Sequence, residues 1–125
     1  MAFTESDLNI SQAEIDDVKA ALVNTGQANA FVNTIAERER QVRDWTAAYV
    51  VPEETLKRLW RPLVLFHIYS LLEQVTKSRQ LAYDEAMKEL TAIRDGEFTQ
   101  YPLADPPPGG GSATGSAWGS DPKIK

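Results

Sequence analysis

The sequence predicts an all-α protein, a small helical bundle of about four helices with an extended C-terminal arm. Apolar residues recur at helical spacing in four segments, and turn signals separate these segments. The connections between them are short, as in helix bundles. After Gly96 the composition changes to proline, glycine and serine, which cannot offset the entropy of ordering a core. We therefore predict a helical bundle domain over residues 1–96 and a Pro/Gly-rich arm over residues 97–125.

The first predicted helix lies in "ISQAEIDDVKAALVNTG". Ser11 and Glu14 have the spacing of a capping box, in which each side chain binds the other residue's backbone N–H. Gly26 can adopt the positive φ that ends many helices. The apolar face comprises Ile15, Val18 and Leu22.

The second helix is predicted from about Ala28 to Tyr49. Its apolar stripe is interrupted by Arg38, where an apolar residue is expected, and its middle, "ERERQVRD", is densely charged. Such a run is either a solvated helix face with i,i+4 ion pairs or a subunit interface built from charge pairs. The stripe comprises Phe31, Ile35, Val42, Trp45 and Tyr49.

Pro52 is suited to the first turn of the third helix, which runs through "TLKRLWRPLVLFHIYSLLEQV". Pro62 is expected either to kink this helix or to restart it. Residues 63–72 are apolar nearly all round, which indicates burial inside the bundle or at a protein interface. The single histidine, His67, is interpreted as a core or interface residue, because no second histidine could share a metal.

The fourth helix is predicted from about Ser78 to Asp95, with Gly96 following its end. Its apolar stripe comprises Tyr83, Ala86, Met87, Leu90 and Ile93. We predict that the core of the bundle includes Leu63, Phe66 and Leu90.

Composition argues against several classes of function. The net charge is −5, whereas non-specific DNA binding needs clustered lysine and arginine. The chain has no cysteine, and it contains no phosphate-binding, triad or calcium-loop motif. We expect no catalytic residues, no cofactor and no metal site. No apolar run could span a membrane, and the polar, acidic N-terminus does not predict a secretory signal.

The segment "LKRLWR" is the strongest nucleic-acid signal. Lys57 and Arg61 are i,i+4 neighbours on one helix face, and Arg58 and Trp60 lie between them in the sequence. We interpret the segment as an amphipathic helix with a solvated basic side. A helix-turn-helix reader is the other interpretation, and the acidic total charge opposes it.

Two stretches, "YVVPEETLKRLWRPLVLFHIYSLL" and "AYDEAMKELTAIRDGEF", resemble the small head–tail connector (adaptor) proteins of Mu-like prophages. The likeness covers about half of the chain. The second family pattern, Tyr-x-x-Ala-x-x-x-Leu-x-x-Ile-x-x-Gly, is matched at every position. Pro62 and a thinned basic cluster at Lys77 and Arg79 depart from the family. The matching residues are Tyr49, Pro52, Leu56, Leu59, Ile68 and Tyr69 in the first stretch, and Tyr83, Ala86, Leu90, Ile93 and Gly96 in the second.

The resemblance implies a structural adaptor of a tailed phage or phage-like particle. Such proteins form a ring, expected to be twelve-fold, beneath the portal protein. They extend the DNA channel and dock the next neck or tail-completion protein. The implied location is the neck of the virion, after synthesis in the bacterial cytoplasm, with DNA passing without sequence-specific contacts. The alternative function is a small helical regulatory or DNA-binding module.

The candidate partner-binding residues lie on the arm and on the second helix. We expect Trp118 to anchor the arm on the portal or a neighbouring subunit, because tryptophan supplies a large contact area. Phe98 and Tyr101 are expected to pin the root of the arm, and "EFTQYPL" could form a short strand on a neighbour's sheet edge. Arg38 and Arg43 are predicted subunit contacts. The alternatives for the arm are an ordinary loose terminus and an artificial linker.

Overall fold

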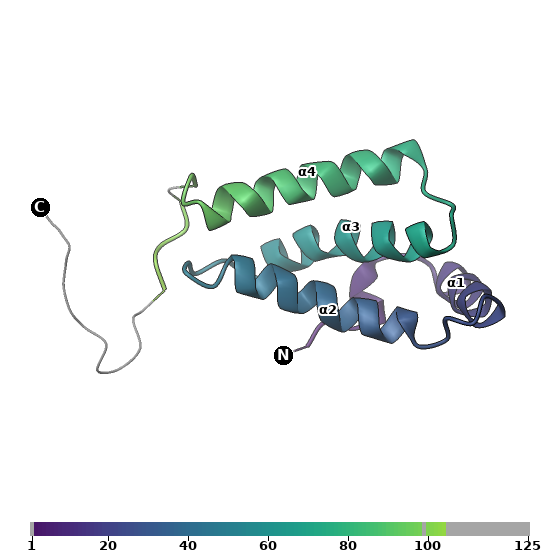
Figure 1. Cartoon of the computed structure of the whole chain (residues 1–125). Coiled ribbons are helices and arrows are strands. Elements are labelled where there is room, and N and C mark those ends of the chain that lie inside the picture. Colours follow the sequence, from purple (N-terminus) through teal and green to yellow (C-terminus); the bar gives the residue numbers. More distant parts are fainter. Residues whose placement is uncertain (1, 99, 105–125) are drawn as a thin grey trace, which may run out of the picture.

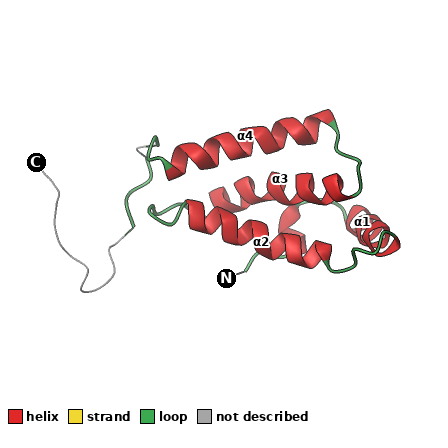
Figure 2. Cartoon of the chain, in the orientation of Figure 1, coloured by secondary structure: helices red, strands yellow, loops and turns green. Residues whose placement is uncertain are grey.

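The computed structural model describes residues 2–98 and 100–104 and confirms the predicted all-α bundle. Helices α2, α3 and α4 lie side by side and run antiparallel in turn, and α3 packs against both neighbours (Figure 1). Helix α1 lies across the end where α2 begins and α3 ends. Figure 2 shows these helices joined by short loops. The elements are η1 (Glu5–Leu8), α1 (Gln12–Asn24), α2 (Ala30–Trp45), α3 (Glu53–Leu71) and α4 (Lys77–Arg94).

The start of α1 keeps only half of the predicted capping box. The Ser11 hydroxyl accepts the backbone N–H of Glu14 at 3.1 Å, as expected. The Glu14 carboxylate, however, accepts the Tyr69 hydroxyl at 2.5 Å and Arg79 at 3.0 Å. Glu14 therefore joins α1 to α3 and α4 instead of completing its own helix cap.

Helix α2 is shorter at both ends than predicted and stops at Trp45. The Thr46 hydroxyl donates to the Val42 carbonyl at 2.9 Å, and its backbone N–H also bonds that carbonyl. Tyr49 lies beyond the helix, where it forms an antiparallel bridge with Leu103. Helical spacing alone placed the end of α2 at Tyr49, because spacing cannot show that Tyr49 pairs with a distant segment.

Helix α3 is the central helix, and it continues through Pro62 without the predicted alternative of a restart. Trp60 is fully buried, and its indole N–H donates to the Ile35 carbonyl of α2 at 3.0 Å. The hydrogen bond satisfies the polar edge of this large side chain. The buried residues of α3 are Leu56, Leu59, Trp60, Leu63, Val64, Leu65 and Ile68.

Leu63 and Leu90 are fully buried, as predicted. Phe66 is only half-buried, so its predicted place in the core is wrong. Its ring stacks on Tyr83 of α4 at a centroid distance of 4.1 Å. Tyr83 is itself partly exposed, which places this pair at the edge of the α3–α4 contact.

The N-terminal segment belongs to the core, although the sequence did not predict this. Phe3 and Leu8 are buried, and the Phe3 ring lies 5.0 Å from that of Trp60. The backbone N–H of Phe3 donates to Glu39 of α2 at 2.9 Å. Among the described residues, no helix is long and apolar enough to cross a membrane.

Candidate interaction surface at the arm root

The described part of the predicted arm returns to the bundle. We call residues 97, 98 and 100–104 the arm root. Tyr49 and Leu103 form an isolated antiparallel bridge. The Val50 N–H donates to the Pro102 carbonyl at 2.7 Å, and the Ala104 N–H donates to the Ala48 carbonyl at 2.9 Å. The segment therefore pairs with the chain's own loop between α2 and α3, so the strand-like pairing predicted for a neighbour's sheet is intramolecular here.

Two predicted residues, Phe98 and Tyr101, hold the arm root against the core. Both side chains are partly buried and pack against the core cluster. Their rings meet edge to face with centroids 6.2 Å apart. This arrangement is favourable for aromatic rings beyond the area it buries. Phe98 and Tyr101 thus lie where the sequence placed them, at the root of the arm.

Gly96 allows the chain to turn from α4 into the arm root. Its φ is +78°, a backbone angle that residues with a side chain rarely adopt. A Cβ atom at this position would lie 2.6 Å from the Tyr49 hydroxyl. Nearby, the Arg94 guanidinium lies 4.5 Å from the centre of the Trp45 ring. Trp45 and Tyr49 both pack partly buried against the core. The end of the bundle is therefore rich in aromatic side chains.

Two apolar side chains next to the bridge are exposed. Val50 is 54% exposed and Leu103 is 71% exposed. Leu103 is itself a bridge residue and Val50 follows its partner Tyr49, so both lie close to the point where the chain continues toward residue 105. Spacing gave no signal for them, because their exposure depends on a pairing between segments about 50 residues apart.

Arg43, a predicted subunit contact, is engaged inside its own chain. Its guanidinium binds Glu53 through two bonds of 2.9 Å and Glu39 at 2.8 Å. It also lies 4.7 Å from the centre of the Phe3 ring. The hydrogen bonds that Arg43 donates to Glu53 and Glu39 raise the pKa of Arg43, and Arg43 in turn lowers the pKa of Glu53. Arg43 thus joins the N-terminal segment, α2 and α3.

Arg38 is half-buried, and its environment differs from that of Arg43. One guanidinium nitrogen donates to Gln41 at 2.6 Å, and the Gln41 amide approaches the Met87 sulfur of α4 at 3.8 Å. The Nε of Arg38 is buried and has no hydrogen-bond partner among the described residues. Arg38 therefore interrupts the apolar stripe, as the sequence indicated, with only part of its hydrogen-bonding capacity used. Trp118, the remaining predicted contact, lies outside the described residues.

The basic side of α3 is only partly the solvated face that the sequence predicted, because Arg58 is exposed whereas Lys57 and Arg61 are partly buried. Lys57 lies 3.2 Å from the Asp7 carboxylate, and Arg61 donates to the Asp7 backbone carbonyl at 2.6 Å. Arg58 forms two hydrogen bonds with Glu89, of 3.0 and 2.6 Å. The Arg58 bond lowers the pKa of Glu89. The cations of "LKRLWR" thus bind η1 and α4 of the same chain.

The remaining charge on the described surface is mainly negative. A group of exposed carboxylates forms no ion pair within the described residues, whereas most of the described cations contact a carboxylate, a carbonyl, an amide or an aromatic ring. This distribution repels the phosphate backbone of nucleic acid. These carboxylates are Asp16, Asp17, Glu37, Asp44, Glu73, Asp84, Glu85 and Glu97.

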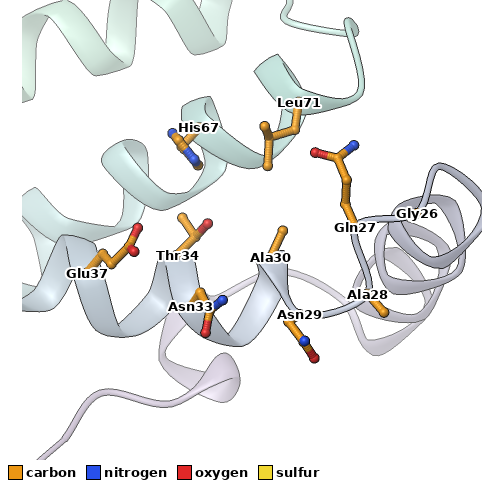
Figure 3. Close-up of a pocket in the computed structure, with 10 residues that line it drawn as sticks. All are labelled: Gly26, Gln27, Ala28, Asn29, Ala30, Asn33, Thr34, Glu37, His67 and Leu71. Atoms are coloured by element: carbon orange, nitrogen blue, oxygen red, sulfur yellow. The ribbon is translucent and has the colours of Figure 1, made fainter.

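A hollow of about 530 Å³ lies between the start of α2 and the end of α3. His67 and Thr34 point toward this space, whereas Asn29 points away from it (Figure 3). Burial and the nearby Arg38 lower the pKa of His67, and Glu37 partly opposes this effect. In the part of the chain that the structure describes, no group of three or more metal-ligating side chains occurs. The partly buried position of His67 agrees with its interpretation as a packing residue.

The fold and this surface define a small all-α bundle, and the arm root packs against an end of this bundle that is rich in aromatic side chains. Comparison of the chain with protein family models, curated proteins and solved structures found no match. The likeness to head–tail connectors therefore rests on the sequence motifs alone.

Proposed function

We propose that this protein is a head–tail connector that forms a ring beneath the portal of a tailed phage or phage-like particle. The observation that carries the proposal is the anchored arm root. The bridge at Tyr49 and Leu103, with Phe98 and Tyr101 packed beside it, fixes the point from which residues 105–125 depart. A segment held at its base can deliver a binding motif to a neighbour at a defined place, which reduces the entropic cost of docking.

Trp118 is the proposed docking anchor of this arm. It is the only large apolar residue between Leu103 and Ile124. Buried in a pocket on the portal or on a neighbouring subunit, it would contribute ~2 kcal/mol or more to docking. The exposed Val50 and Leu103 beside the arm root would add apolar area to the same contact.

The surface charge supports a channel through which DNA passes. Eight exposed carboxylates form no ion pair within the described residues. Lys57, Arg58 and Arg61 are engaged within the chain. Negatively charged residues lining the channel would repel the DNA phosphates and so keep DNA from adhering to the ring. The same contacts weigh against the alternative of a DNA-binding module, because reading DNA through this basic face would require breaking them.

The test is assembly with the portal protein encoded in the same genome. We expect the isolated chain to be a monomer or small oligomer and to form a large ring when it is mixed with the portal, measured by mass in solution and by electron microscopy. Trp118→Ala should weaken docking by itself. A chain that shifts DNA mobility at moderate salt and has no affinity for the portal would contradict the proposal and favour a regulator.

The second helix offers a separate test of the ring. We propose Arg38 as a subunit contact, because it places a charged, half-buried side chain within the apolar stripe of α2, where a charge without a counterion is costly. Particles carrying Arg38→Ala should assemble poorly. Normal assembly and packaging by this variant would show that Arg38 has no role in the interface. Arg43 is a weaker candidate, since its guanidinium already binds Glu39 and Glu53.

A further inference from the structure

A groove on the outer side of α4 lies directly beside the arm root. It has a volume of about 350 Å³, and Phe98 and Ala92 supply its apolar surface. Its other lining residues are Glu85, Lys88, Glu89 and Glu97. A second hollow, of about 400 Å³, shares Lys88, Ala92 and Glu97 with it. Together they form a continuous face of α4, which we call the α4 groove.

The α4 groove combines an apolar surface with uncompensated negative charge. Arg58 neutralises Glu89 through two hydrogen bonds. Glu85 and Glu97 form no ion pair within the described residues, and Asp84 beside them accepts only the Gln80 amide at 3.1 Å. Lys88 is the one cation among the lining residues. The groove is therefore complementary to a segment in which an apolar residue is flanked by cations.

The chain carries such a segment at its own C-terminus. Lys123, Ile124 and Lys125 place one β-branched apolar residue between two cations. These lysines are the only cations in residues 105–125. A stretch of 21 residues can span at most about 70 Å when fully extended, which is long enough to reach a groove beside the arm root. Glu97 and Phe98 line the groove and belong to the arm root, so the chain departs from the same end of the bundle that carries the groove.

We infer that the α4 groove binds the C-terminal segment Lys123–Lys125 of the same chain. Ile124 would cover the exposed part of Phe98, and the two lysines would face Glu85 and Glu97. Intramolecular docking is favoured over docking on a second copy, because a short linker gives a high effective concentration. The contact does not depend on the proposed connector role, since it would form in a chain that never meets a portal.

Paramagnetic relaxation measured by NMR on the full chain tests this contact. The chain has no cysteine, so Ser120→Cys gives a single attachment point for a nitroxide label. We expect the label to broaden the amide signals of Glu85, Lys88 and Ala92, with the amides of α1 as the internal reference at the opposite end of the bundle. Equal signal loss in α1 and α4 would overturn the inference.

Charge variants test the recognition itself. Lys123→Glu combined with Lys125→Glu should abolish the broadening of α4, and so should Glu85→Lys. Asp17→Lys, which changes the net charge equally on α1, should leave it unchanged. Raising the salt to about 1 M, where the screening length falls to about 3 Å, should reduce it. Broadening that survives reversal of both lysines would contradict docking by charge complementarity.

A mixed sample distinguishes the chain's own terminus from that of a second copy. Isotope-labelled protein without the nitroxide is combined with unlabelled protein that carries it, so that only contacts between molecules cause broadening. We expect no signal loss in α4 in this mixture at low concentration. Broadening in the mixture equal to that within the labelled chain would overturn the intramolecular assignment and identify a second copy as the occupant.

Discussion

Leu90 provides the sharpest test of how α4 is held on the bundle. Its side chain is fully buried where α4 packs on α3. Leu90→Ala removes apolar atoms from the core and leaves a cavity that the neighbouring helices fill only partly. Substitutions of this kind cost about 2–5 kcal/mol, and the cost rises with the volume of the residual cavity. Because the exposed fraction of Leu90 is 0%, we expect a value within this range rather than below it.

The same helix provides a matched control. Leu81 is 59% exposed, so Leu81→Ala makes the same chemical change on α4 without opening a cavity. We expect it to alter the free energy of unfolding by less than about 0.5 kcal/mol.

Thermal unfolding followed by circular dichroism should separate the two variants. In a domain of this size, 1 kcal/mol corresponds to a shift in Tm of about 4–8 °C. Leu90→Ala should therefore lower Tm by roughly 10 °C or more, while Leu81→Ala should move it little. A shift of under a degree for Leu90→Ala, or equal shifts for both variants, would refute the placement of α4.

Three further predictions concern the arm, the histidine and the arginine cluster. Truncation after Ala104 should leave the Tm nearly unchanged, whereas truncation after Gly96 should lower it. Only the second truncation removes Phe98, Tyr101 and the bridge to Tyr49. Equal Tm values for the two truncated chains would contradict the anchored arm root. Burial lowers the pKa of His67 below 6.5, so the imidazole binds a proton more readily in the unfolded state than in the folded state. The free energy of unfolding should therefore fall as pH decreases through about 6.5. His67→Gln should flatten this pH dependence, measured by denaturant titrations at several pH values. Arg43→Lys should lower the Tm, because an ammonium cannot replace the paired bonds to Glu53 while also binding Glu39; an unchanged Tm would show that the cluster contributes little to stability.

The sequence by itself determined the fold class and the cores of the helices. Apolar spacing is a local property, so Ile15, Val18, Leu22, Leu63 and Leu90 were identified as buried without knowledge of the fold. The helix-ending glycines were equally local, and both Gly26 and Gly96 adopt positive φ. Phe98 and Tyr101 were placed at the root of the arm from the sequence, and both pack against the core there.

Only the tertiary structure decided which side chains meet across the chain. The Glu14 carboxylate binds Tyr69 and Arg79 rather than its own helix start, and Arg43 binds Glu53 within its own chain. Tyr49 leaves α2 to pair with Leu103, which exposes Val50 at the arm root. These outcomes depend on the relative positions of residues 10 to 65 apart in the sequence, and helical periodicity carries no information about such distances. The spacing of apolar residues therefore identified most of what each helix buries, with Phe66 as the exception, and packing between helices decided where the charges and the arm root lie.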